Sequence, residues 1–290
     1  MNANKLVRPL IVAQDLSAIG SLSQQVALPI LAAFNLPQAM LPTSLLSTQT
    51  EGFTTPVKVE LSSWITQTKR HWQQQQLAFN GLLLGYLGTA SLVASMQNLL
   101  QDLPLSLVVI DPVMADRNLL YPDLSADYPR QLTAVLPWAT VITPNLTEAQ
   151  LLTGIKVRSR PTETEQYQLL TTLEQKLPPA GHAVITGITK QKQSGCIWLT
   201  AKRVQFFGRQ QLAGHFYGSG DAFAALLTGF LATGESLTNA IHYAVSGTYC
   251  ALRQTAASHR ERRFGLALAN LLFMLSEYNQ TGNWPPYFQR

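Results

Sequence analysis

The stretch Leu105-Ser106-Leu107-Val108-Val109-Ile110-Asp111-Pro112 is a short, mostly apolar run that ends in an acid and a proline. An apolar run of this length predicts a strand buried on both faces, as in a parallel sheet. Proline has no N–H to donate to a strand ladder, so Asp111 marks the carboxyl end of the strand. The stretch therefore predicts an acidic side chain at one edge of a buried sheet.

Similar apolar runs alternate with helical stretches along the chain. We expect further strands at Leu6–Ala13, Gly81–Tyr86, Thr140–Thr143 and Ala183–Thr186, and a hairpin of Cys196–Thr200 with Val204–Phe207. We expect helices at Leu22–Phe34 (with a kink or a late start because of Pro29), from Thr55-Pro56 to Gln75, and at Ser91–Leu100, Leu124–Leu136, Thr162–Lys176, Ala222–Leu231, Ser236–Gln254 and Arg260–Tyr278. This alternation predicts an α/β fold whose mostly parallel central sheet carries helices on both faces.

The composition limits the class of protein. The 290 residues are 46% hydrophobic and 13% charged, which excludes a disordered chain and is ample for a large core. No apolar run approaches the about 20 residues of a membrane span, and the N-terminus lacks a signal-peptide pattern. We expect residues 1–290 to form a single domain in the cytoplasm, with a C-terminal tail at about 279–290.

Charge and cysteine content exclude further classes. The net charge is +5, and its one tight basic cluster is Arg260, Arg262 and Arg263, so we expect no nucleic-acid partner. A mildly basic balance suits anionic small molecules. Cys196 and Cys250 are too few for a disulfide scaffold or a four-cysteine zinc site, and we expect both to be reduced.

Polar residues follow the predicted strands, where ligands bind in open α/β sheets. The most distinctive motif in the chain is Gly218-Ser219-Gly220-Asp221, directly before the predicted helix 222–231. Glycines let the backbone approach a ligand closely, and free N–H groups at a helix start favour an anion. A carboxylate at the same place suits phosphoryl transfer, because it can take the proton from the attacking hydroxyl. The alternative is a glycine turn with an acidic helix cap.

Two acidic residues, Glu148 and Asp111, predict a metal site. Asn145 and Glu148 lie three residues apart after a predicted strand, on one side of a helix start, where oxygen-bearing side chains can hold Mg²⁺ through its waters. The alternative is a plain capping arrangement. Asp111 can serve Mg²⁺ or a substrate, or simply form a turn.

In this order and spacing, six stretches resemble the pyridoxal/pyridoxamine kinases, the vitamin B6 branch of the ribokinase-like superfamily. They are 14–20 (QDLSAIG), 46–53 (LSTQTEGF), 85–88 (GYLG), 111–114 (DPVM), 143–148 (TPNLTE) and 218–221 (GSGD). The resemblance covers the chain from about Pro9 to Leu252. It implies a ribokinase-like three-layer sandwich, a homodimer, and ATP-dependent phosphorylation of the 5′-hydroxymethyl group of a B6 vitamer.

The resemblance also implies roles for single residues. Asp221 matches the catalytic base, and Gly218, Ser219 and Gly220 match the anion hole. The residues matched to ATP binding are Asp111, Thr143, Asn145, Glu148 and Thr186, with Asp111 and Glu148 near Mg²⁺. The vitamer pocket is matched by Asp15, Ser17, Thr50 and Tyr86. A monovalent cation is a further possible requirement.

The chain departs from the usual pattern at three pocket positions. Many pyridoxal kinases have serine where Asp15 stands, and relatives often read Ser-Thr-His-Thr-Gly-Gly-Phe where this chain has Gln49 and Glu51 in residues 47–53. As a hypothesis, the Asp15 carboxylate binds the ring nitrogen, the 3′-hydroxyl or the amine of pyridoxamine. These departures leave the preferred vitamer open.

Two alternatives remain, a hydroxymethylpyrimidine or hydroxymethylpyrimidine-phosphate kinase and a non-catalytic B6-binding protein. The retained Asp221 argues against the second. Other nucleotide and hydrolase classes are disfavoured, because the first strand is followed by no GxGxxG, and the chain has no GxxxxGK[ST] and no GxSxG.

Overall fold

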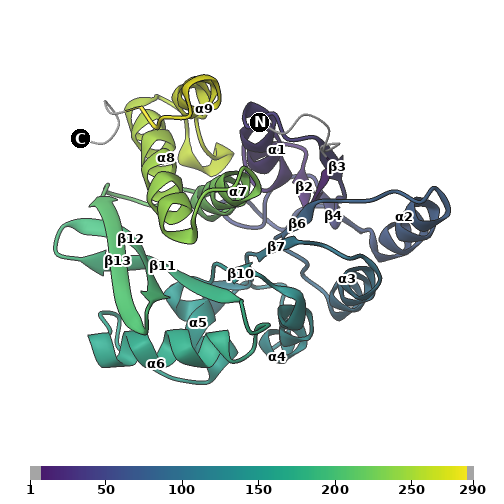
Figure 1. Cartoon of the computed structure of the whole chain (residues 1–290), viewed down its shortest axis with the longest axis horizontal. Coiled ribbons are helices and arrows are strands. Elements are labelled where there is room, and N and C mark those ends of the chain that lie inside the picture. Colours follow the sequence, from purple (N-terminus) through teal and green to yellow (C-terminus); the bar gives the residue numbers. More distant parts are fainter. Residues whose placement is uncertain (1–7, 286–290) are drawn as a thin grey trace.

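An eight-stranded sheet runs through the middle of the molecule (Figure 1). The structure is a computed structural model, and it describes residues 8–285. The order of the strands is β13-β12-β11-β10-β7-β6-β1-β3. Their bounds are β1 (Leu10–Ala13), β3 (Gln38–Met40), β6 (Gly81–Leu84), β7 (Leu107–Ile110), β10 (Val141–Ile142), β11 (His182–Lys190), β12 (Gln193–Thr200) and β13 (Arg203–Gln210). Strands β3, β1, β6, β7, β10 and β11 pair in parallel, whereas β12 and β13 are antiparallel.

Helices cover both faces of this sheet (Figure 1). One face carries α1 (Gln24–Ala33), α7 (Ser219–Ala232), α8 (Leu237–Ala257) and α9 (Ala269–Thr281). The other carries α2 (Ser62–Gln74), α3 (Ala90–Asp102), α4 (Tyr128–Leu132), α5 (Leu146–Thr153) and α6 (Glu163–Glu174). The predicted three-layer α/β arrangement is confirmed.

The central strands have no polar face because each of their sides belongs to a different core. In β1, Leu10 and Val12 pack with the helices of one face, while Ile11 and Ala13 pack with those of the other. Successive strand residues point to opposite faces, so a continuous apolar run is what a doubly covered sheet needs. This is the physical reason that the strand positions could be read from the sequence.

Two small sheets and two short helices complete the fold. A three-stranded sheet contains β2 (Leu16–Ser17), β4 (Ser44–Leu46) and β5 (Lys58–Glu60), and a two-stranded hairpin contains β8 (Ala115–Asp116) and β9 (Leu119–Leu120). The 3₁₀ helices are η1 (Thr133–Trp138) and η2 (Arg262–Phe264). None of these short strands was predicted.

The helix predicted to start at Thr55-Pro56 is wrong at its beginning. Residues 58–60 form β5, which pairs antiparallel with β4, and α2 starts only at Ser62. Cross-strand pairing outweighs the local Thr-Pro helix cap here. Pro29, for which a kink or a late start was predicted, does not end its helix. The helix α1 runs from Gln24 to Ala33 with Pro29 inside it.

The single helix predicted for Arg260–Tyr278 is also wrong. Its first part forms η2, and α9 begins at Ala269. Ser21 exchanges backbone hydrogen bonds with Phe264 and Leu266, and Gly265 has a φ of +81°. This backbone pairing keeps residues 264–266 from joining an α-helix.

Three smaller differences concern element length. The predicted helix 124–136 is divided into α4 and η1, and the strand predicted at 183–186 continues past Gly187 to Lys190 through an irregular register. In the expected tail, residues 279–281 belong to α9, and Trp284 packs against Phe230 and Tyr243, while 286–290 lie outside the described residues. Residues 6–7 of the first predicted strand lie outside them as well.

Among residues 8–285, no helix has the length and apolar character needed to cross a membrane.

Candidate active site

A cleft of about 530 Å³ lies between the carboxyl ends of the parallel strands and the start of α7. Strand β1 has β3 on one side and β6 on the other, so the chain reverses its direction of winding there. In open α/β sheets this switch point is where ligands bind. A cavity of this volume is within the range of small-molecule sites.

The cleft brings together nearly all of the predicted site residues. It is lined by Asp15, Thr50, Tyr86, Asp111, Thr143, Asn145, Glu148, Thr186, Gly218, Ser219, Gly220 and Asp221. Ser17 does not line it. Its side chain is fully buried, and its hydroxyl donates to Asp15 Oδ2 at 3.5 Å. The structure therefore places Ser17 behind Asp15 rather than in the cavity.

The loop 218–221 forms the start of α7. Gly218 is the N-cap residue with a φ of +85°, and a Cβ there would lie 3.0 Å from the Ser21 carbonyl oxygen, so this turn needs glycine. Asp221 stands in the first helical turn, where its Oδ2 accepts a hydrogen bond of 2.9 Å from the Ser23 N–H. Burial, with a smaller contribution from the Asp15 charge, raises the pKa of Asp221 to about 6. A carboxyl with such a pKa suits general-base catalysis near neutral pH.

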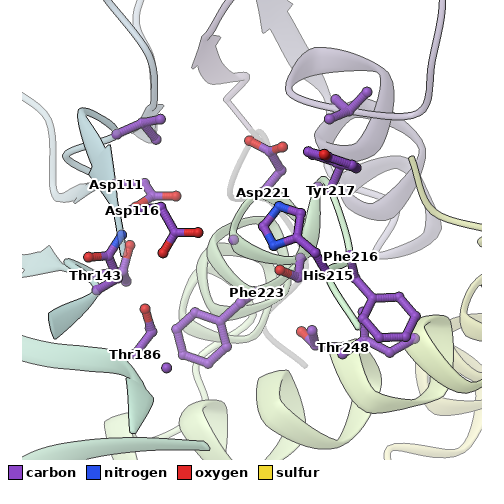
Figure 2. Close-up of a pocket in the computed structure, with 18 of the residues that line it drawn as sticks. Asp111, Asp116, Thr143, Thr186, His215, Phe216, Tyr217, Asp221, Phe223 and Thr248 are labelled. Carbon is purple, nitrogen blue, oxygen red and sulfur yellow. The ribbon is translucent and has the colours of Figure 1, made fainter. Parts of the chain in front are cut away.

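Asp111 and Thr143 lie on one wall of the cleft, and Asp221 lies on the other (Figure 2). Asp111 is 6% exposed and follows β7, as predicted. Burial raises the pKa of Asp111 well above its usual value, and the charges of Glu148 and Asp221 add to this, while the Thr143 hydroxyl opposes it. A Cβ on Gly220 would lie 3.5 Å from Asp111 Oδ2. The acid is thus adjacent to the glycine loop.

Glu148 has a structural role that the sequence left open as an alternative. It forms a capping box with Asn145, in which Glu148 Oε2 accepts from the Asn145 N–H at 2.8 Å and Asn145 Oδ1 accepts from the Glu148 N–H at 3.0 Å. Glu148 Oε1 also accepts from the Met114 N–H at 3.0 Å. Burial nevertheless raises the pKa of Glu148 to about 7. The capping alternative is confirmed, and the same carboxylate still lines the cleft.

The two carboxylates fit a divalent cation held through water. Among residues 8–285, no group of three or more His, Cys, Asp or Glu side chains could hold a metal ion. Asp111 and Glu148 are buried, and the charge of Glu148 helps to raise the pKa of Asp111, so a cation nearby would relieve their repulsion. Mg²⁺ usually keeps several waters and takes one or two carboxylates. The donors present therefore suit Mg²⁺ better than a metal that needs a full protein cage.

The strand ends beside β10 and β11 form the next part of the wall. Asn145 and Thr186 form an isolated parallel bridge, and the Thr186 N–H donates to the Pro144 carbonyl at 2.9 Å. The Asn145 side chain donates to the Ala115 carbonyl at 2.7 Å. This bonding fixes Thr186 at the cleft surface. Beyond it the cleft extends along α8, past Val245 and Thr248, which the sequence analysis did not single out.

The other end of the cleft lies after β1 and β6. Asp15 is 5% exposed, and burial raises its pKa. Tyr86 has a buried hydroxyl without a hydrogen-bond partner in the part of the chain that the structure describes. Thr50 and Tyr86 also line a neighbouring cavity of about 260 Å³. An acid, an aromatic side chain and polar hydroxyls thus line one end, which suits a heteroaromatic ring.

The cleft rim contains two residues that sequence reasoning missed, Asp116 and Arg117. On the β8–β9 hairpin, Asp116 and Arg117 line the cleft, and the Arg117 guanidinium lies 2.9 Å from His215 Nδ1. His215 Nε2 lies 3.9 Å from Glu51 Oε2. Three loops therefore meet across the cleft mouth. A short hairpin with exposed charged side chains has no distinctive sequence pattern.

The cleft thus holds a carboxylate with a pKa near 6 at a helix start, a glycine loop for an anion, an acidic pair for a cation, and a ring-sized end. This combination can bind a polyphosphate beside an aromatic alcohol and remove the alcohol's proton.

Comparisons with known proteins agree with this geometry. A family model described as "Phosphomethylpyrimidine kinase" matches residues 32–263. A hydroxymethylpyrimidine/phosphomethylpyrimidine kinase of Haemophilus influenzae is 31% identical over 167 residues, which are 54% of this chain and 59% of that protein. A pyridoxal kinase of Arabidopsis thaliana is 29% identical over 201 residues, which are 63% of this chain and 61% of that protein. This chain therefore matches about three-fifths of the length of these two relatives.

A solved structure matches almost the whole chain. The crystal structure of pyridoxal kinase from Lactobacillus plantarum is 39% identical and has a TM-score of 0.91, covering 95% of this chain and 99% of that one. The predicted resemblance to pyridoxal kinases and the predicted ribokinase-like fold are confirmed.

Proposed function

The chain belongs to the phosphomethylpyrimidine kinase family, and from this premise we propose that it transfers the γ-phosphoryl group of ATP to the 5′-hydroxymethyl group of pyridoxal, pyridoxamine or pyridoxine. The observation that carries the proposal is the position of Asp221. It opens α7 beside the glycine loop, faces Asp111 across the cleft, and lies near Asp15 at the ring-sized end.

Catalysis is mainly positioning and electrostatics. The N–H groups of residues 218–220 at the start of α7, of which that of Ser219 also donates to the Phe216 carbonyl at 3.4 Å, hold the negative charge that develops on the transferred group. The Asp221 carboxylate takes the proton of the attacking hydroxyl, and a pKa of about 6 keeps it ionised at neutral pH while leaving it basic enough for this step.

Asp111 and Glu148 are the residues that would hold Mg²⁺ through water. The bound cation would neutralise phosphate charge. Glu148 remains fixed by the backbone N–H groups of Met114 and Asn145, so its carboxylate keeps one orientation when the cation binds. Asp111 and Thr143 lie near Glu148, where they would face the phosphates of bound ATP.

In this proposal, ATP occupies the part of the cleft that runs from the glycine loop toward α8. Its phosphates lie between the glycine loop and Thr143, Asn145 and Thr186, and its base lies toward α8. The vitamer occupies the other end. Tyr86 supplies an aromatic side chain there, and Asp15 and Thr50 supply polar atoms for the substituents of the pyridine.

A second candidate substrate is hydroxymethylpyrimidine or its phosphate. The 31% identity to the Haemophilus kinase supports it, and this substrate also carries a hydroxymethyl group on a heteroaromatic ring. The 39% identity and near-complete coverage of the Lactobacillus structure support the B6 vitamer as the better candidate.

A homodimer is part of the proposal. Leu45 and Val59 are cross-strand partners on β4 and β5 and are 41% and 51% exposed. These two neighbouring apolar side chains are the proposed contact, and β5 is an edge strand of its sheet, which can pair with another chain. A second copy of the chain is the proposed occupant.

The free thiols Cys196 and Cys250 are consistent with a reducing compartment such as the cytoplasm.

Steady-state kinetics test the proposal. The kcat/KM values with ATP and Mg²⁺ should be highest for a B6 vitamer among pyridoxal, pyridoxamine, pyridoxine and hydroxymethylpyrimidine, and mass spectrometry should find the 5′-phosphate. Turnover of hydroxymethylpyrimidine alone would favour the second candidate. Tight vitamer binding without ATP consumption would support a binding protein instead.

A further inference from the structure

Ser23 lies between the two ends of the cleft. It is the N-cap residue of α1 and lines the cleft. Its backbone N–H donates to Asp221 Oδ2 at 2.9 Å, although the two residues are 198 positions apart in the sequence. Asp221 stands at the start of α7, so this bond joins the starts of two helices. It fixes one oxygen of the Asp221 carboxylate through a backbone donor.

The backbone of Ser23 is strained. Its φ of 45° and ψ of −123° lie in a region that suits glycine and that residues with a Cβ rarely adopt. Such a conformation persists only where the surroundings determine it. Three hydrogen bonds do so here. The Ser23 carbonyl accepts the first helical N–H groups, from Val26 and Ala27, and the next residue, Gln24, donates its N–H to the Asp15 carbonyl at 3.3 Å.

Ser23 also contacts the second acid. Its hydroxyl faces the Asp15 carboxylate and lowers the pKa of that group. Charged groups that act on Asp221 come from two strand ends, Asp15 after β1 and Asp111 after β7, and both are acids. In the described part of the chain, the Ser23 N–H is therefore the group that offsets this repulsion at Asp221.

We propose that Ser23 is a positioning residue, whose strained backbone aims its N–H at Asp221 and keeps this carboxylate in line with the substrate hydroxyl. The inference rests on the proposed function, since Asp221 is the base of that reaction. The proposed role belongs to the backbone conformation of residue 23. The Ser23 hydroxyl interacts with Asp15 and is not part of this role.

Ser23→Val tests the proposal, because a β-branched residue cannot adopt this φ and must move the N–H. We expect kcat to fall about 10²-fold, as for a group displaced by about 1 Å, with the KM for ATP little changed. Gln76→Val is the matched control. Gln76 has a φ of 54° in the exposed segment just after α2, so a β-branched residue is strained there too, but outside the cleft. We expect this control to lose stability and keep its kcat.

A double-mutant comparison separates positioning from general damage. In an Asp221→Asn background, Ser23→Val should lower kcat no further, because the base it positions is gone. An equal loss in both backgrounds would overturn the proposal. Ser23→Gly provides a second variant that accepts the conformation and retains the N–H, so it should keep at least tenfold more kcat than Ser23→Val.

A crystal structure of Ser23→Val decides the matter without an activity assay. We expect the Asp221 carboxylate to have turned away from its wild-type position. An unmoved carboxylate would refute the positioning role even if the wild-type protein acts on another substrate. Failure of the proposed function appears instead as a wild-type protein that phosphorylates no B6 vitamer.

Discussion

At the scale of single residues, the charge of Asp15 influences the base. Burial and, to a smaller extent, the Asp15 charge together raise the pKa of Asp221 to about 6. The base must be ionised, so kcat/KM should rise with pH and level off above about 6. Asp15→Asn removes a negative charge and should move this rise to lower pH. A pH profile that is unchanged in the variant would show that the two carboxylates do not interact.

The same pKa predicts a stability effect. Folded Asp221 binds its proton more tightly than the unfolded chain does, because its pKa is raised above the ordinary 3.8. Its contribution to stability is therefore lost as pH rises through about 6. Asp221→Asn should raise the melting temperature of the ligand-free protein at pH 8, and the gain should shrink toward pH 5. Melting curves at both pH values test this, and a variant less stable than wild type at pH 8 would contradict it.

Residue positions were predictable where a motif fixed the backbone. Asp221 and Asp111 follow a glycine loop and a strand end, and both patterns are local. Ser23 was not predictable in this way, because its part in the site is a backbone N–H and an unusual φ. Ser17 shows the opposite error, since a polar residue in a matching stretch proved to be fully buried.

At the scale of elements, the start of α7 is where added bulk tests the proposed phosphate position. Gly220 lies in the first helical turn, where Asp111 Oδ2 would be 3.5 Å from an added Cβ. Gly220→Val should therefore obstruct the phosphate position and lower kcat/KM for ATP by at least about 10²-fold, as for a lost anion-hole donor. Circular dichroism should show a folded protein. Normal kinetics would place the phosphate elsewhere.

The η2 segment shows why element boundaries were harder to predict than elements. Arg262 donates to the Ala213 carbonyl at 2.8 Å and lies 4.1 Å from the Phe216 ring centroid, while Gln49 donates to the Arg263 carbonyl at 2.6 Å. These contacts join η2 to two loops of the cleft. A periodicity read along the chain cannot anticipate them, because the partners are distant in sequence. The basic cluster was visible in the sequence, but its purpose within the fold was not.

At the scale of the whole molecule, the proposed homodimer places the exposed strand β5 in its interface. Val59→Glu places a charge on the apolar face proposed to meet a second copy. We expect sedimentation velocity to show a dimer for the wild type and a shift toward monomer for the variant. A wild-type monomer, or a variant that remains dimeric, would exclude this face as the interface.

The layer architecture was the most predictable feature of the molecule. Apolar runs such as 105–110 can be satisfied only by burial on both faces, and this requires helices above and below. The substrate is less predictable, because its choice depends on a few side chains at one end of the cleft. Asp15, Gln49 and Glu51 depart there from the usual pattern of pyridoxal kinases.

The most direct test of the central claim is the turnover number of Asp221→Asn with ATP, Mg²⁺ and pyridoxal. Loss of the general base should lower kcat by about 10²–10⁴-fold, while equilibrium binding of ATP and pyridoxal stays close to that of the wild type. A variant that still phosphorylates pyridoxal at nearly the wild-type rate would contradict the account.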